Sequence, residues 1–180
     1  MANLRDIKKR ISSVTSTKQI TRTMEMVSTA KIRRALDRAT QAEPYKKALT
    51  DVMHTVASDA ESVGDNPMLQ THEEFKRGLI IAVTSDRGLA GGFNVNVERT
   101  CEKIAREWEH DGAECEIIAC GRKASEYFRS RANTVMHFEG SSADPSLKDA
   151  RMIASYICDE YSKGQLDRVE IVYHHARNRV

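Results

Sequence analysis

The first sixty residues carry hydrophobic side chains at helical spacing. Ile7, Ile11 and Val14 follow Leu4 at steps of four or three residues, the spacing of a coiled-coil seam. The phase of this pattern shifts across residues 15–19. A second stripe then comprises Ile20, Met24, Val27, Ile32, Leu36 and Ala39. A phase shift in a heptad pattern changes the local supercoil without ending the helix, so we predict one long helix.

Two sequence features bear on the continuity of this helix. Residues 12–17 read SSVTST and are poor helix formers, but the period holds on both sides and neither glycine nor proline interrupts them. Pro44 is the only proline in the segment and should kink the helix. We predict that the long helix occupies residues 1–60, kinked near Pro44, and that a polar connector follows over residues 61–75.

From residue 76 onward, segments with a hydrophobic period of two residues, typical of strands, alternate with segments of period 3.6, typical of helices. Four strands are predicted, at Leu79–Thr84, Cys115–Cys120, Thr134–Phe138 and Val169–His174. Helices are predicted between them, the last one capped by Asp144, opened by Pro145 and ended by Gly164. Its expected buried face is Leu147, Ala150, Ile153, Ile157 and Tyr161. Alternating strands and helices indicate an α/β domain over residues 76–180, with a mostly parallel sheet covered on both faces.

No other segment of the chain is long enough to pack along the whole apolar stripe. A helix of this length does not stand alone in water, because its stability comes from packing of its apolar face. We expect the stripe to pack on another protein or on a C-terminal helix that this chain does not contain.

Charge and composition narrow the class of protein. Residues 1–60 carry twelve Lys and Arg against six Asp and Glu, and the other 120 residues carry sixteen against twenty. This basic first third predicts an acidic partner. No apolar run approaches the roughly 20 residues of a spanning helix, and the N-terminus lacks a signal peptide. We expect a protein without direct bilayer insertion, with Cys101, Cys115, Cys120 and Cys158 as reduced thiols.

The glycine-rich segment Ser85–Asn94 follows the first predicted strand and precedes a helix. It contains Asp86, Arg87, Gly88, Gly91 and Gly92, but neither the G-x-G-x-x-G spacing nor the lysine of a P-loop. It also lacks the G-x-S-x-G of a nucleophile elbow. We interpret it as a tight strand-to-helix turn in which glycine provides positive φ, with no cofactor.

Metal binding is not expected either. Adjacent His174 and His175 would point to opposite faces of a strand, so they cannot share one metal ion. Cys115 and Cys120, five residues apart, should likewise face opposite sides of the sheet as core thiols.

Two other function classes stay open at this point. A nucleotide-dependent α/β enzyme with a helical arm would bind ATP or a dinucleotide, although its loop lacks the expected lysine. A nucleic-acid-binding protein would use the basic arm and bind any duplex in a salt-dependent way, but no aromatic residue precedes Tyr45.

Several segments resemble the γ subunit of F-type ATP synthases. The segments Ile7–Val14 and Thr17–Lys31, with the Met-Glu-Met-Val motif at residues 24–27, resemble the N-terminal helix of that family. The turn at Ser85–Asn94 looks like the family's turn after its first strand, where some members carry cysteine at the position of Ala90. Asp144–Leu147 and Gly164–Asp167 fit the later part. Family members continue into a long C-terminal helix that pairs with the N-terminal one, which would account for the unpartnered stripe.

The resemblance implies a central-stalk rotor without catalysis of its own. It would couple proton-driven rotation to conformational change at catalytic sites in a ring of α and β subunits. Its Rossmann-like domain would carry no nucleotide and would sit against the ε subunit and the membrane c-ring. The missing transit peptide favours a bacterial source, with a peripheral location at the cytoplasmic face of the cell membrane.

On this resemblance, we predict which helix residues meet which partner. The ring-facing residues are expected to be Arg10, Lys18, Arg22, Met24 and Lys31. The coiled-coil seam is expected to comprise Ile7, Ile11, Val14, Ile20, Val27 and Leu36. Replacing Met24 by lysine should then harm rotation-coupled synthesis more than ATP hydrolysis. We also expect the isolated chain to pair with itself through the exposed stripe.

Overall fold

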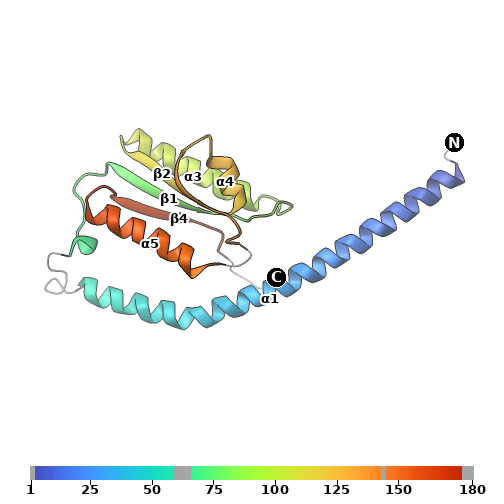
Figure 1. Ribbon diagram of the computed structural model, residues 1–180, viewed down its shortest axis with the longest axis horizontal. Helices are drawn as coiled ribbons and strands as arrows, with labels where there is room; N and C mark the ends of the chain where they lie inside the picture. The colour runs from blue at the N-terminus through green and yellow to red at the C-terminus, as the bar shows by residue number, and fades with distance from the viewer. Residues whose placement is uncertain (1–2, 59–65, 143–144, 176–180) are drawn as a thin grey trace. The chain divides into compact units, whose positions relative to one another are not determined.

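The computed structural model describes residues 3–58, 66–142 and 145–175 (Figure 1). The chain divides into two compact units, Met1–Val63 and Gly64–Val180. The described part of the first unit is one long helix. The described residues of the second unit form a four-stranded sheet, three α-helices and one short 3-10 helix.

Helix α1 runs without interruption over Leu4–Ser58. At 1.5 Å per residue its 55 residues span about 82 Å along the axis. The predicted continuity across residues 12–17 is confirmed. Hydroxyl groups there bond within the helix: Thr17 Oγ1 donates to the carbonyl oxygen of Ser13 at 3.0 Å, and Thr21 Oγ1 donates to that of Thr17 at 2.9 Å. These bonds satisfy the polar groups that otherwise compete with helical structure.

The helix also continues through Pro44. Proline cannot donate the backbone hydrogen bond of an interior position, and Figure 1 shows the ribbon of α1 bending in its second half. Residues 61–65, the start of the predicted connector, lie outside the described residues. Beyond them, the 3-10 helix η1 (Pro67–Leu69) begins after Asn66, whose side chain accepts from the backbone N–H of Met68 at 3.0 Å.

The sheet of the second unit is parallel throughout its described strands. These are β1 (Arg77–Val83), β2 (Glu114–Cys120), β3 (Asn133–Phe138) and β4 (Arg168–Val172), in the order β3-β2-β1-β4. Each neighbouring pair runs in the same direction. The predicted α/β class with a long N-terminal helix is therefore confirmed. The fourth strand ends at Val172, two residues before the predicted end.

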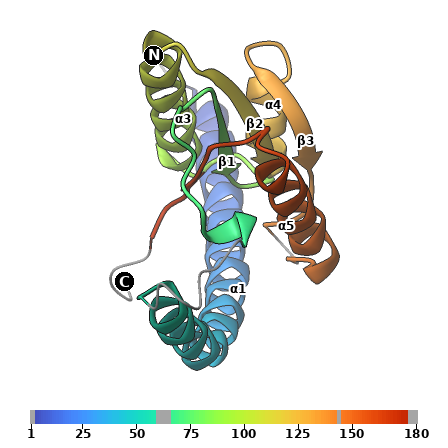
Figure 2. The same ribbon diagram turned by 90° about the vertical axis from the view of Figure 1, so that its left-hand side faces the viewer.

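Helices cover both faces of the sheet (Figure 2). Helices α3 (Phe93–His110) and α4 (Arg122–Phe128) pack on one face, and α5 (Leu147–Ser162) packs on the other. Strand residues alternate between the two cores, so Ile80 contacts the α3 side while neighbouring Ile81 contacts the α5 side. Cys115 and Cys120 lie on opposite faces, as their spacing predicts.

Helix α5 begins later than the sequence suggests. Its N-cap is Ser146, whose hydroxyl accepts from the backbone N–H groups of Lys148 and Asp149, and its first residue is Leu147 rather than Pro145. Asp144 lies outside the described residues. Ser146 is the cap because its side-chain oxygen reaches the free N–H groups of the first helical turn. At the other end the predicted stop is confirmed, since Gly164 takes a φ of 68°.

The packed face of α5 also begins later than predicted. Leu147 is 67% exposed and Ala150 is also exposed, so both predicted face positions are wrong. Ile153, Tyr156 and Ile157 are the residues that pack against the sheet. These three are spaced at i, i+3 and i+4, and Leu147 and Ala150 lie in the first turn of the helix, before the residues that pack against the sheet.

Candidate functional site

Helix α1 presents an apolar stripe that is not buried. None of its 55 residues, all of them described, has a buried side chain. Val14 is 62% exposed and Ile20 61%, and Ile7, Ile11 and Val27 lie between 46% and 61%. Leu36 alone of the predicted seam is half-buried. Contiguous apolar surface on this scale indicates an interaction surface.

The continuous helix distributes the predicted contact residues over two rows. Val14, Lys18 and Arg22 are four residues apart and share one side, with Arg10 beside Val14. Ile20, Met24, Val27 and Lys31 follow one another at steps of four, three and four, so they share another side. At 100° per residue the centres of these two rows lie about 130° apart around the helix, although Arg10 is only about 40° from Met24. Met24 and Lys31 are thus neighbours of the seam residues Ile20 and Val27, and the five predicted ring-facing residues do not form one face.

The glycine-rich segment forms the turn between β1 and α3. Gly91 has a φ of 56°, but neither Gly88 nor Gly92 has a positive φ. Leu89 does, at 62°, and its side chain is 96% exposed. The expectation that glycine supplies the positive φ therefore holds only at Gly91. Arg87 and Gly88 lie exposed at the same turn, and Gly92 is the residue that precedes α3.

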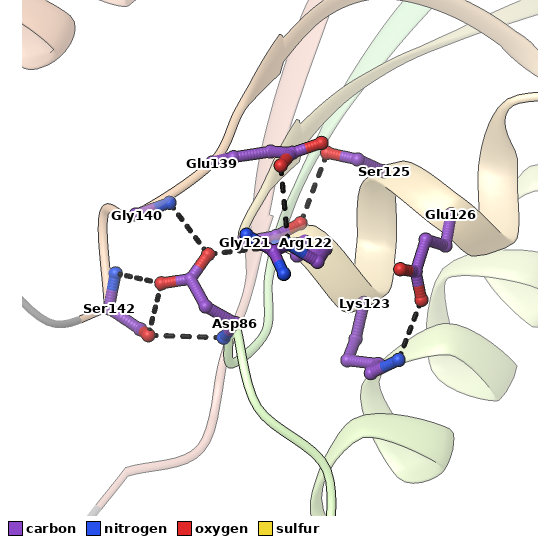
Figure 3. A network of polar contacts seen from close by, with 9 residues as sticks. All are labelled: Asp86, Gly121, Arg122, Lys123, Ser125, Glu126, Glu139, Gly140 and Ser142. Carbon is purple, nitrogen blue, oxygen red and sulfur yellow. Dashed lines mark hydrogen bonds and ion pairs between the residues drawn. The ribbon is translucent and has the colours of Figure 1, made fainter.

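Asp86 joins three turns at the carboxyl end of the sheet (Figure 3). One of its carboxylate oxygens, Oδ1, accepts from the backbone N–H of Arg122 at 3.0 Å and of Gly140 at 2.7 Å. The other oxygen accepts from both the backbone N–H and the hydroxyl of Ser142. Its own backbone N–H donates to Ser142 Oγ at 3.1 Å. The turns after β1, β2 and β3 are thus held by one side chain.

The charge of Asp86 is stabilised by these donors. Partial burial acts to raise the pKa of the carboxyl group, but hydrogen bonds from Ser142, Gly140 and Arg122 outweigh it and hold the pKa below its usual 3.8. In many α/β folds the same edge of the sheet binds a phosphate group with backbone N–H donors. Here the backbone N–H groups of Arg122, Gly140 and Ser142 are bonded to a carboxylate of the chain.

Neighbouring residues lock the same edge. Asn94, 8% exposed, accepts from the backbone N–H of Ser85 at 2.9 Å and ties the turn to α3. Gly121 is the N-cap of α4 and has a φ of 100°. It lies so close to the end of β1 that a β-carbon there would be 2.3 Å from the carbonyl oxygen of Thr84. Only glycine fits this position.

A second carboxylate fastens the opposite end of the sheet. Asp167 accepts from the backbone N–H groups of Lys76 and Arg77, both at 2.8 Å, and lies 2.7 Å from His72 Nδ1. The ring of His72 stacks on Tyr161 with centroids 4.4 Å apart. The segment that leads into β1 is thereby held against the end of α5 and the start of β4.

Sequence reasoning selected Asp86 but missed its partners. Arg122, Gly140 and Ser142 lie 36, 54 and 56 residues away in the chain. No local motif connects them; only the parallel topology, which brings the carboxyl ends of β1, β2 and β3 to one edge, could have suggested the cluster.

The described residues contain no group of three or more His, Cys, Asp or Glu side chains placed to hold a metal ion. His174 instead stacks on Phe93 at 4.4 Å, beyond the end of β4. Burial raises the pKa of the Cys101 and Cys115 thiols to about 12 and that of Cys120 to about 11, which makes them poor nucleophiles. Over the ranges that the structure covers, no helix has the length and hydropathy to cross a membrane.

Comparisons with known proteins agree on one family. The family model described as ATP synthase matches residues 3–180. The ATP synthase gamma chain of Chlorobium phaeobacteroides (strain BS1) is 37% identical over 99% of this chain and 61% of its own length. Those of Geobacter sp. (strain M21) and Pelotomaculum thermopropionicum are 38% and 39% identical, over 96% of this chain and 60% of their own length. The chain spans about three fifths of these curated relatives, and it belongs to the ATP synthase family.

Proposed function

We propose that this chain acts as the central-stalk, or gamma, subunit of an F-type ATP synthase. In this role it couples proton-driven rotation to conformational change at catalytic sites formed by α and β subunits, and it performs no catalysis itself. The observation that carries the proposal is helix α1, which is 55 residues long and buries no side chain. The names of the similar gamma chains support the same role.

The physics of the long helix fits a shaft. An isolated helix gains most of its stability from packing, so the exposed stripe of α1 requires a protein cover. A coiled-coil partner helix would cover one side, and a surrounding ring would meet the others. Such a ring contacts more than one side of a shaft. Lys18 and Arg22 in one row, and Met24 and Lys31 in the other, can therefore all face the ring together with Arg10, even though the five residues share no single row.

Charge suits a contact that must slide. Residues 1–60 carry a net charge of +6. Long-range attraction between a basic shaft and acidic loops guides association without fixing one angular position, whereas a tight apolar interface would favour one. The α/β unit would occupy the foot of the stalk, against an ε subunit and a membrane c-ring, as a peripheral component at the cytoplasmic face of a bacterial membrane.

The contacts of Asp86 support the proposal that the α/β unit does not bind a nucleotide. The backbone N–H groups of Arg122, Gly140 and Ser142 at this edge already bond to its carboxylate, so they are not free to hold a phosphate group. We therefore expect the isolated chain to bind neither ATP nor a dinucleotide, which equilibrium dialysis would check.

Capture by the catalytic subunits tests the proposal. The chain is mixed with separately produced α and β subunits, with and without a peptide covering the gamma chain's C-terminal helix, and the complexes are purified. We expect stoichiometric capture that increases with the peptide. Failure of capture in both conditions, together with tight binding of ATP or of duplex DNA, would show that the chain has another function.

Met24 provides a sharper test of the sliding contact within an assembled synthase. Met24→Lys places a charge beside Ile20 and Val27. We expect Met24→Lys to reduce ATP synthesis more than ATP hydrolysis. Equal losses of both activities in Met24→Lys would contradict this interface assignment.

A further inference from the structure

Strand β3 lies at an edge of the sheet. It pairs with β2 only, and its other side has no strand neighbour among the described residues. Natural edge strands usually carry charged residues or proline that discourage further pairing. The sequence of β3, NTVMHF, contains neither lysine, carboxylate, glycine nor proline. This edge therefore lacks the protective residues that would keep another strand away.

An open apolar groove runs beside this edge. It has a volume of about 570 Å³ and is lined by Met136 of β3 and by residues of α5, including Leu147, Met152 and Tyr156. Leu147 is 67% exposed and Met152 46%. The register of β3 shifts between Ile117 and Ile118 of β2, so both Val135 and Met136 pack on the α5 side. Methionine side chains adapt to partners of varied shape, which suits a docking groove.

The charges along the groove have one sign. Lys148 and Arg151 are its charged lining residues, and no carboxylate lines it. Neither cation forms an ion pair with another described residue, whereas Lys123 pairs with Glu126 at 2.6 Å and Lys163 with Glu160 at 3.1 Å. A partner with carboxylates would supply the missing counter-charges.

We propose that β3 and α5 form a strand-addition site for an extended segment of a partner protein in which apolar and acidic residues alternate. The segment pairs its backbone with the free side of β3. Its apolar side chains enter the groove over Met136 and Met152, and its carboxylates meet Lys148 and Arg151. This is the β-augmentation mode, in which backbone hydrogen bonds supply affinity and alternate side chains supply specificity. The inference does not depend on the subunit role proposed above.

A peptide experiment on the whole chain tests the site. The probe is a fluorescently labelled peptide of about seven residues in which valine alternates with glutamate. A second peptide of the same composition has its valines in one block, and a third replaces glutamate by lysine. Fluorescence anisotropy measures binding, and hydrogen exchange measures protection of the β3 amides at residues 133–138.

Charge-reversal variants supply the control. We expect the alternating acidic peptide to bind best, to slow exchange at β3 about tenfold or more, and to bind about tenfold or more weakly to the Lys148→Glu, Arg151→Glu double variant. The Arg99→Glu, Arg129→Glu variant makes the same charge change at exposed residues of the opposite face and should bind normally. Equal binding of the blocked peptide, unchanged β3 exchange, or equal weakening in both variants would overturn the proposal, as would no binding at all.

Discussion

The two units of this chain obtain order in different ways. Helix α1 has 55 residues and no buried side chain, whereas the α/β unit buries fifteen hydrophobic residues in two cores. Hydrophobic burial stabilises a fold by about 25 cal/mol for each Å² removed from water. The α/β unit therefore has its own source of stability. The helix must obtain its stability from a partner, which is what a shaft component requires.

Polar contacts between residues far apart in the sequence also hold the α/β unit together. Asp86 and Asp167 fasten opposite ends of the sheet by bonds that span between 36 and 95 residues of sequence. The side-chain hydrogen bonds described for α1 stay within one helical turn. Long-range bonds of this kind make a unit cooperative, so the α/β unit should unfold as a whole while α1 frays independently.

Gly121→Ala should cause the largest loss of stability, and this loss should be confined to the α/β unit. Its β-carbon would lie 2.3 Å from the carbonyl oxygen of Thr84, and alanine disfavours the φ of 100°. We expect a loss of about 3 kcal/mol or more in the free energy of unfolding. Fluorescence of Trp108, the single tryptophan and a buried residue of α3, reports this unit during urea titration.

Gly88→Ala is the matched control for this change. A β-carbon at Gly88 would meet no atom within 4 Å, and the φ of Gly88 is not positive. Its urea midpoint should stay close to that of the unchanged chain. Similar losses in the two variants would mean that the close approach to Thr84 is not what requires glycine.

Asp86→Asn should have an intermediate effect. The amide has one acceptor oxygen where the carboxylate has two, so the bonds to Ser142 or those to Arg122 and Gly140 lose their acceptor. We expect a loss of about 2 kcal/mol at neutral pH, again followed by Trp108 fluorescence.

The pH dependence sharpens this prediction. Because the folded-state pKa of Asp86 is depressed below its usual 3.8, the carboxylate contributes stability above about pH 4, and this contribution is lost as pH falls through the depressed value. Asp86→Asn should remove this part of the acid sensitivity and leave the part due to Asp167, whose pKa is also lowered. An identical fall in stability between pH 5 and pH 3 in both proteins would argue against the role of Asp86.

Polar substitutions on the stripe should affect stability least. The double variant Ile20→Ser, Val27→Ser changes side chains that are 61% and 50% exposed, so the free energy of unfolding of the α/β unit should stay within about 0.5 kcal/mol of that of the unchanged chain. Self-association through the stripe, in contrast, should weaken. Light scattering over a concentration series checks this expectation, and an unchanged chain that is monomeric at high concentration would contradict it.

The fold was accessible from sequence wherever hydrophobic period decided the structure. The strands around Leu79–Val83 and Cys115–Cys120, and the helix through Ser12–Thr17, follow from local pattern. The start of α5 did not. Asp144 and Pro145 match the usual signals for the start of a helix, but the side chain that reaches the first free N–H groups is that of Ser146. The positive φ of Leu89 and the partners of Asp86 depend on tertiary contacts that no local spacing records.

Hydrogen exchange of the whole chain tests the contrast between the units most directly. Amide protection is measured at a concentration where the chain is monomeric, alone and with α and β subunits plus the peptide of the gamma chain's C-terminal helix. We predict strong protection of β1–β4 in both samples, and protection of residues 4–58 only in the complex. Equal protection of α1 in the monomer and in the complex would contradict the account, because the helix would then be stable without a partner.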